Sequence, residues 1–304
     1  MNVYIVILLF IVIAVMRVVQ KVCGKISSDE IKSGKQFFAF GALYQGVAAI
    51  LAFIAVLFVG FDGFNAGLIV CSVLMAALFA VDLFSGTEAL KGCSIAVVTM
   101  FGLGGLVISV VASYFWFGEE IRIHQLIGLI VFFVSAYLLS SGGGKSEKKM
   151  SVKTLSLLFA NFLANGLAMV VQKYFALIVD GANSSLFSCV TFVLCCLFML
   201  VCAFLSGRKK SSENVGDNAV KTENTPNKKL IVCGVFLAVA VFLINIIITE
   251  MSKSVPSIII FPVSSAICII IATLVGYFGF KEKLSLKKTI GLIVGVAAVI
   301  IIGV

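Results

Sequence analysis

A lysine and a glutamate occupy matching positions in each half of this 304-residue chain. Lys21 closes the tetrapeptide Val-Val-Gln-Lys, which returns with Lys173 in the last position. Glu88 belongs to the pattern Thr-Glu-x-x-Lys, which returns around Glu250. Because opposite charges near the ends of helices can pair and part, we predict two gates: Lys21–Glu88 and Lys173–Glu250. In the alternative interpretation, each glutamate binds the lysine three residues further along its own helix, and the two gate lysines reach toward solvent.

A second group of candidate residues is uncharged and lies inside apolar segments. Asn161 and Asn165 are four residues apart, so they share one face of a helix. Glycines and a proline at matching depth in the two halves would bend the helices that contain them. Side-chain amides and bent backbone suit a binding site for a small organic molecule, whereas close helix packing is the alternative role of the small residues. The predicted binding set is Tyr44, Gln45, Gly102, Gly104, Asn161, Asn165, Asn245, Pro262, Ser264 and Ser265.

Composition places all of these residues in a membrane. Hydrophobic residues make up 61% of the chain and charged residues only 12%, against about 25% charged residues in a soluble domain. Apolar stretches of about 20 residues, the length that crosses a bilayer, recur along the chain. We predict an all-α integral membrane protein with ten transmembrane helices, near residues 3–20, 36–59, 66–84, 92–117, 123–140, 153–175, 183–205, 230–249, 255–280 and 287–303.

The ten spans are predicted to form two repeats of five. The pentapeptide IGLIV at 127–131 returns at 290–294, near the end of the second repeat. Since each repeat has an odd number of spans, the second repeat enters the membrane in the opposite direction. The predicted units are a first repeat at 1–140, a linker at 141–152 and an inverted second repeat at 153–304 that contains a flexible polar loop at 206–229.

The basic residues predict the orientation of the chain. Outside the spans, nineteen of the 23 Lys and Arg residues fall on one side, and only Arg122 and Lys253 fall on the other. Basic loops stay in the cytoplasm, so both termini are expected on the non-cytoplasmic side.

The end of each repeat carries the same short motif. An apolar helix ends in Phe117-Gly118-Glu119 and the next begins with Ile127-Gly128; in the second repeat the letters are Phe280-Lys281-Glu282 and Ile290-Gly291. Together with Ala89-Leu90 before the fourth span, this pattern resembles the EamA-type members of the drug/metabolite transporter superfamily. The second repeat departs from it locally, with Met251-Ser252 at the matching place. The resemblance implies that four helices of each repeat surround a central cavity and that the fifth is peripheral.

An internal inverted repeat favours a secondary active transporter that works by alternating access. The expected substrate is a small organic metabolite, amino-acid-like solute or drug, with export favoured. A flippase for lipids or amphiphiles and a proton-coupled multidrug efflux protein are the alternatives. Asp82 and Arg17, each placed near the end of its span, are the predicted coupling residues, although they could also pair with each other. The lack of an acidic residue at the centre of a predicted span disfavours proton-coupled export.

Other classes fit the sequence less well. An enzyme would need a nucleophile with a base, or a metal cluster, and the only histidine is His124. We therefore predict no enzyme activity, no cofactor, no metal and no nucleic-acid partner. The expected partners are the lipid bilayer and a small-molecule substrate, and the expected state is a monomer or weak homodimer. The excess of Lys over Arg points to an AT-rich bacterial genome and thus to the plasma (inner) membrane.

Overall fold

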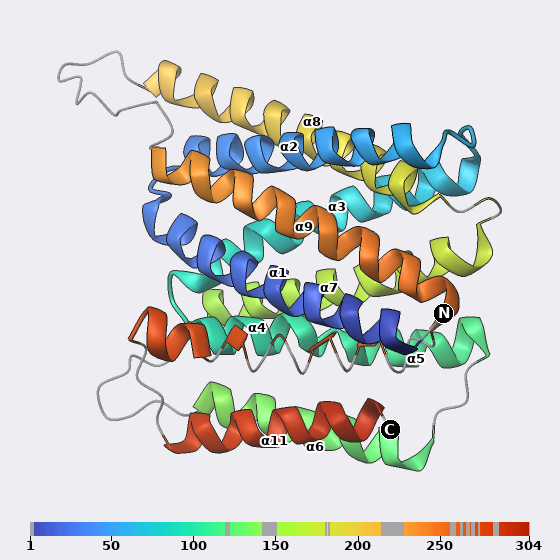
Figure 1. The fold of residues 1–304 in the computed structure, drawn as a ribbon. Coiled ribbons are helices and arrows are strands. Elements are labelled where there is room, and N and C mark those ends of the chain that lie inside the picture. The colour runs from blue at the N-terminus through green and yellow to red at the C-terminus, as the bar shows by residue number, and fades with distance from the viewer. Residues whose placement is uncertain are drawn as a thin grey trace.

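The computed structural model is a bundle of α-helices that lie roughly parallel or antiparallel to one another (Figure 1). It describes residues 3–118, 122–141, 151–179, 181, 183–213, 228–255, 260–261, 264–265, 268, 271–272, 274–281 and 286–303. Its helices are α1 (Val3–Glu30), α2 (Gly34–Val59), α3 (Ala66–Leu90), α4 (Ile95–Gly104), α5 (Leu106–Phe117), α6 (Ile123–Ser141), α7 (Val152–Ile178), α8 (Ser184–Glu213), α9 (Lys228–Ser254), the π-helix η1 (Val275–Gly279) and α11 (Leu286–Gly303).

Seven helices of the described chain are long and apolar enough to cross a membrane. They are α1, α2, α3, the consecutive pair α4 and α5, α7, α8 and α9. Shorter apolar helices lie within α6 and α11, at Ile123–Ser135 and Thr289–Ala298. The prediction of an all-helical, multi-pass membrane protein is thereby confirmed. Many residues of the predicted span 255–280 lie outside the part of the chain that the structure describes.

Polar side chains at the helix starts explain where several spans begin. Ser33, Asn65 and Ser94 accept hydrogen bonds from the backbone N–H groups of Gln36, Leu68 and Val97. Each satisfies a donor that the first turn of the helix leaves without an internal partner.

Several helices, α1 and α3 among them, continue beyond the ends that the sequence predicted. α1 was expected to end at residue 20 and α3 at residue 84, but they run to Glu30 and Leu90. The apolar stretch ends where expected, yet the Lys, Ser and Glu residues that follow are compatible with a helix, so hydropathy alone misplaces the boundary. As a result, Lys21 and Asp82 lie well inside their helices.

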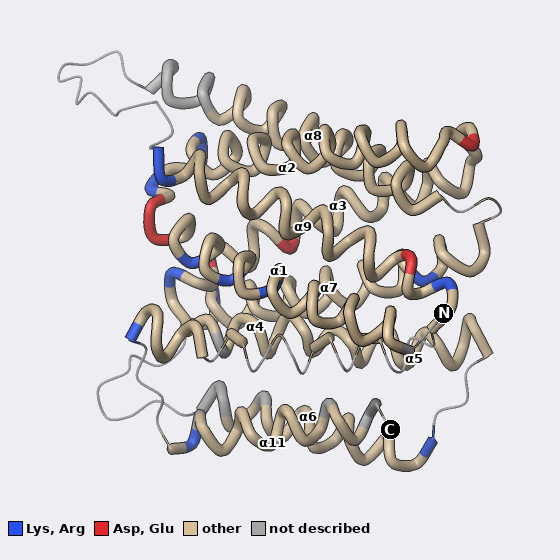
Figure 2. The backbone as a smooth tube through the Cα atoms, viewed as in Figure 1, with Lys and Arg blue, Asp and Glu red and all other residues tan. Residues whose placement is uncertain are grey.

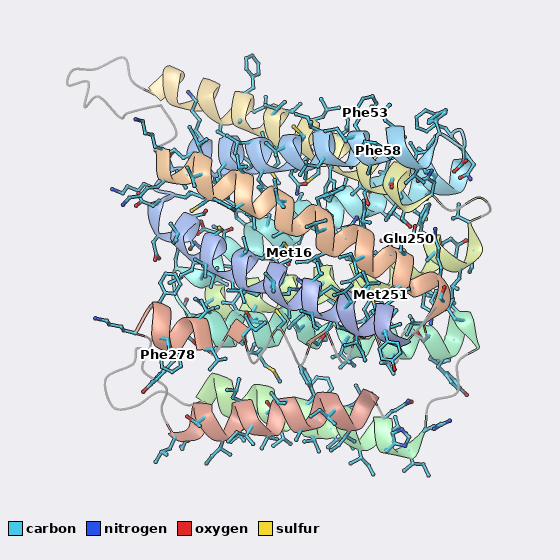
Figure 3. The ribbon with its side chains drawn as sticks, viewed as in Figure 1. Met16, Phe53, Phe58, Glu250, Met251 and Phe278 are labelled. Carbon is cyan, nitrogen blue, oxygen red and sulfur yellow. The ribbon has the colours of Figure 1, made fainter. Side chains whose placement is uncertain are left out.

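Helix pairs from distant parts of the chain form the bundle. α2 packs against α8, α3 against α7, α1 against α9 and α6 against α11. In the core between α1 and α9, Met251 is fully buried and Met16 packs against the same cluster (Figure 3). The α6–α11 pair lies side by side at one edge of the bundle (Figure 1). The hydroxyl of Ser135 on α6 donates to the carbonyl oxygen of Gly291 on α11 at 2.5 Å.

The junction between α4 and α5 touches the backbone of α7. A Cβ atom at Gly105 would lie 2.4 Å from the backbone nitrogen of Gly166, and one at Gly102 would lie 2.4 Å from the side-chain oxygen of Asn161. A Cβ at Gly104 would lie 2.8 Å from the ring of Phe132. These glycines therefore let helices approach closely, which is the alternative role considered for them from the sequence.

Charges lie mainly at the ends of the helices (Figure 2). One end of the bundle, where α2 begins and α3 ends, carries Lys32, Lys35, Lys91, Lys153 and Lys229; we call it the lysine-rich face. The sides of the bundle expose large apolar residues, among them Phe53, Phe58 and Phe278 (Figure 3). Exposed aromatic and aliphatic side chains on the sides, with charges at the ends, are what a bilayer requires.

Candidate functional site

A cavity of about 160 Å³ lies between helices from both halves of the chain. Its walls come from α1, α2, α3, α4 and α7, with Leu237 and Val241 of α9. Its volume is close to that of an engineered cavity of about 150 Å³ that holds benzene. Among the residues predicted from the sequence, the cavity brings together Arg17, Lys21, Tyr44, Gln45, Asp82, Gly102, Asn161 and Asn165.

The carboxylate of Asp82 is held by two amides of α7. The side-chain nitrogen of Asn161 donates to Asp82 Oδ1 at 2.6 Å, and that of Asn165 donates to the same oxygen. The spacing of four residues between the two asparagines puts both donors on one face of the helix, as predicted. These bonds tie α3 of the first half to α7 of the second.

The depth of Asp82 differs from the sequence-based prediction. Asn165 is at the centre of α7, which has 27 residues, so it is about 20 Å from either end at 1.5 Å per residue. Since Asp82 bonds to Asn165, its carboxylate lies at mid-depth and not near the end of a span. Asp82 is also eight residues before Leu90, the last residue of α3, so it is further from a helix end than the sequence predicted.

Two cations of α1 face this carboxylate across the cavity. Arg17 and Lys21 are one turn apart, and both line the cavity together with Asp82. One terminal nitrogen of Arg17 donates to the side-chain oxygen of Gln20 at 2.8 Å. Its Nε is buried and has no hydrogen-bond partner among the described residues. The cavity thus combines one carboxylate with two cations, an arrangement that can bind both a positive and a negative group of one solute.

Two further polar groups in the cavity wall have no partner in the described chain. The side-chain nitrogen of Gln45 donates to the Tyr44 hydroxyl at 2.8 Å, but its oxygen has no donor. The hydroxyl of Thr99 also has none. Gln45 is 1% and Thr99 2% exposed, and a buried polar group without a partner costs about 1–3 kcal/mol. Both residues belong to the wall of the cavity.

Thr99 and Gln20 are cavity residues that the sequence analysis missed. A signal for Thr99 was present, because it lies three residues before Gly102 and so shares its face of α4. The signal for Gln20 was its position beside Lys21 in the repeated tetrapeptide.

A second set of buried polar groups lies outside the cavity and joins α7, α8 and α9. The side-chain nitrogen of Gln172 donates to Asn245 Oδ1 at 2.6 Å, and Asn245 Nδ2 donates to the Ser188 hydroxyl at 2.8 Å. We call Gln172, Ser188 and Asn245 the amide cluster. They lie toward the end of α7, the start of α8 and the end of α9, which is the end of the bundle opposite the lysine-rich face. Asn245, predicted to bind substrate, therefore does not line the cavity in this structure.

The predicted gate residues have the following partners. Glu88 pairs with Lys91 at 2.5 Å and Glu250 with Lys253 at 2.9 Å, which is the pairing along one helix considered as the alternative. Lys21 lines the cavity. Lys173 is 1% exposed; its Nζ lies 3.3 Å from the Ser113 hydroxyl, to which it donates, and 4.8 Å from the ring centre of Phe117.

The remaining predicted residues lie away from the cavity or outside the described chain. Ser264 and Ser265 are buried, and the hydroxyl of Ser264 donates to the carbonyl oxygen of Phe261 at 3.1 Å. Gly104 lies against Phe132 and Phe162. Pro262 lies outside the described residues.

The sequence profile of the EamA-like transporter family matches residues 152–304, half of the chain. This protein therefore belongs to the EamA-like transporter family, a family of transporters and not of enzymes, as the sequence motifs predicted. The fold is similar to that of a protein whose crystal structure is solved, with a TM-score of 0.64 and 14% sequence identity. The match covers 97% of this chain and 94% of that one. At this identity the likeness concerns the fold alone. No curated protein matches the chain.

Proposed function

We propose that this protein is a secondary active transporter that moves a small, amino-acid-like organic solute through the cavity, with export favoured. The observation that carries the proposal is the polar lining of the cavity. Asp82, Arg17 and Lys21 lie in it together with Gln45 and Thr99, whose buried oxygens have no partner among the described residues. A solute with an ammonium and a carboxylate group would complement the two kinds of charge. The volume of the cavity restricts the solute to a small molecule.

The symmetry of the helix contacts supports two inverted five-helix repeats, 1–140 and 153–304, joined by the linker 141–152. When the two halves are exchanged, the α3–α7 contact becomes the α9–α1 contact, and both are present. The α2–α8 and α6–α11 pairs each join a helix to its own counterpart. Such a pseudo-twofold arrangement places a binding site between the repeats and lets either side open in turn.

We infer that this conformation is open toward the lysine-rich face. The cavity wall includes Leu90, the last residue of α3, and Ile95, the first residue of α4, so the cavity extends to that face. The amide cluster closes the bundle at the opposite end. If the lysine-rich face is cytoplasmic, both termini lie outside, consistent with their position at one end of the bundle (Figure 1). A bacterial plasma membrane is the proposed location.

Proton-coupled efflux is a second candidate function, favoured by the depth of one residue. The carboxylate of Asp82 lies at mid-depth beside Arg17, where a change in its protonation would change the charge of the cavity. Asp82 and Arg17 therefore remain our proposed coupling residues.

The proposal is tested in proteoliposomes that contain the purified protein and an internal mixture of amino acids. Uptake of each radiolabelled amino acid is measured with and without a pH gradient. We expect exchange of one or a few of them, and loss of that exchange in the Gln45→Leu, Thr99→Val double variant. A Ser156→Ala variant, altered at an exposed hydroxyl of α7, is the matched control. Equal exchange by the double variant and the wild type would contradict the assignment of the cavity.

A further inference from the structure

A second, larger hollow lies on the side of the bundle and faces the bilayer. It has a volume of about 670 Å³ and lies among α2, α3, α7 and α8. Its lining is apolar and includes Phe38, Val73, Ala77, Phe84, Leu157 and Phe198. We call it the apolar groove.

Among the described residues, Ser85 and the free thiol Cys202 are the polar side chains that line the groove. The Ser85 hydroxyl donates to the carbonyl oxygen of Val81 at 2.7 Å. Val73, Phe84 and Phe198 are each about half exposed, so the groove opens on the lipid-facing side. A hydrocarbon chain suits a lining of this kind, because its contacts are apolar throughout.

Two lysines lie between groove residues and the lysine-rich face along their helices. Lys35 precedes Phe38 by three residues on α2, and Lys153 precedes Leu157 by four residues on α7. Each lysine therefore shares a helix face with a groove residue, one turn nearer the end of the bundle. Both lysines are exposed. Glu88, near the end of α3, is paired with Lys91.

We propose that the apolar groove binds one acyl chain of an anionic phospholipid whose phosphate lies at Lys35 and Lys153. The hydrocarbon lining receives the chain, and the two exposed ammonium groups lie at the depth where a headgroup begins. Two lysines near an anionic headgroup strengthen binding by about 30-fold over a neutral lipid. This lipid site is separate from the solute cavity and does not depend on what is transported.

The same helix forms a wall of both sites. Val81 and Phe84 of α3 line the groove, whereas Asp82 and Leu83 line the cavity. A bound lipid therefore fixes the position of the helix that carries the carboxylate of the cavity. Occupancy of the groove should restrain α3 against α7.

Native mass spectrometry of the delipidated full-length protein tests this site. The protein is titrated with phosphatidylglycerol or with phosphatidylcholine of the same acyl chains, and the bound fraction is measured. We expect phosphatidylglycerol to bind about 30-fold more tightly. The Lys35→Gln, Lys153→Gln double variant should lose this preference. A Lys229→Gln, Lys287→Gln double variant, which removes the same charge at other exposed positions, should keep it.

A second pair of variants tests the groove itself. Ala77→Phe places a ring at an exposed groove position and should lower the affinity for both lipids tenfold or more. Val235→Phe, on the exposed side of α9, should leave both affinities unchanged. Val81→Phe repeats the test if Ala77→Phe elutes as an aggregate. Equal affinity of the wild type for the two lipids, or unchanged binding after filling of the groove, would overturn the proposal. Inorganic phosphate should not compete, because it lacks the chain.

Discussion

The bonds from Asn161 and Asn165 to Asp82 make a quantitative prediction about the contact between the two halves. Hydrogen bonds between membrane helices contribute about 0.6 kcal/mol on average and at most about 1.7 kcal/mol. Bonds to a carboxylate belong at the upper end of that range, because the acceptor is charged. We therefore expect Asn165→Ala to lower the free energy of unfolding by about 1.5 kcal/mol. Asn161→Ala should have a similar effect, since both amides donate to the same oxygen.

The perturbation is measured by a double-mutant cycle in detergent, with unfolding by sodium dodecyl sulfate followed by circular dichroism. In the Asp82→Leu background the cost of Asn165→Ala should fall to about 0.5 kcal/mol or less, since the acceptor side chain is gone. Ser156→Ala, whose hydroxyl bonds only along its own helix, should be nearly neutral in either background. Fully additive costs of the Asp82 and Asn165 changes would refute the argument that these residues join α3 to α7.

Three further predictions concern other contacts. Gly105→Ala should lower the free energy of unfolding by about 1–3 kcal/mol, because the added Cβ overpacks against the backbone of α7. Gly24→Ala, where a Cβ meets nothing within 4 Å, should be neutral or stabilising in the same unfolding assay. Asn245→Leu should loosen the amide cluster, seen as faster hydrogen exchange at the adjoining ends of α7 and α9; unchanged exchange would argue against a closed end there. Lys173 and Glu250 are tested by exchanging their charges, first singly and then together. Uptake that is lost in the single variants and restored in the double variant would establish the predicted gate. Failure of the double variant to restore uptake would support the pairing of Glu250 with Lys253.

The sequence predicted most of the polar residues that line the cavity, for a simple physical reason. A polar side chain in an apolar span must find a partner inside the bundle, since lipid offers none. Tyr44, Gln45, Asn161 and Asn165 follow this rule, and all of them line the cavity. The spacing of the two asparagines was sufficient to place them on one face.

The rest could not be predicted because it depends on helix ends and pairings. Hydropathy ended α3 too early and so put Asp82 near the surface, although the helix continues to Leu90. Asn245 was expected in the binding site, but its partners Gln172 and Ser188 come from two other helices. Which amides face the same space is decided by how the helices pack.

The most direct test of the account is equilibrium binding of the solute identified in the exchange screen. Its dissociation constant is measured for the purified wild type and for Thr99→Val, which keeps the shape of the side chain and removes only the hydroxyl without a partner. We predict binding at least about fivefold weaker in the variant, from the loss of one hydrogen bond of about 1 kcal/mol. The thermal stability of the empty protein should be equal to or higher than that of the wild type, because the variant removes a buried hydroxyl that has no partner among the described residues. Equal affinity of the two proteins would contradict the claim that this cavity is the transport site.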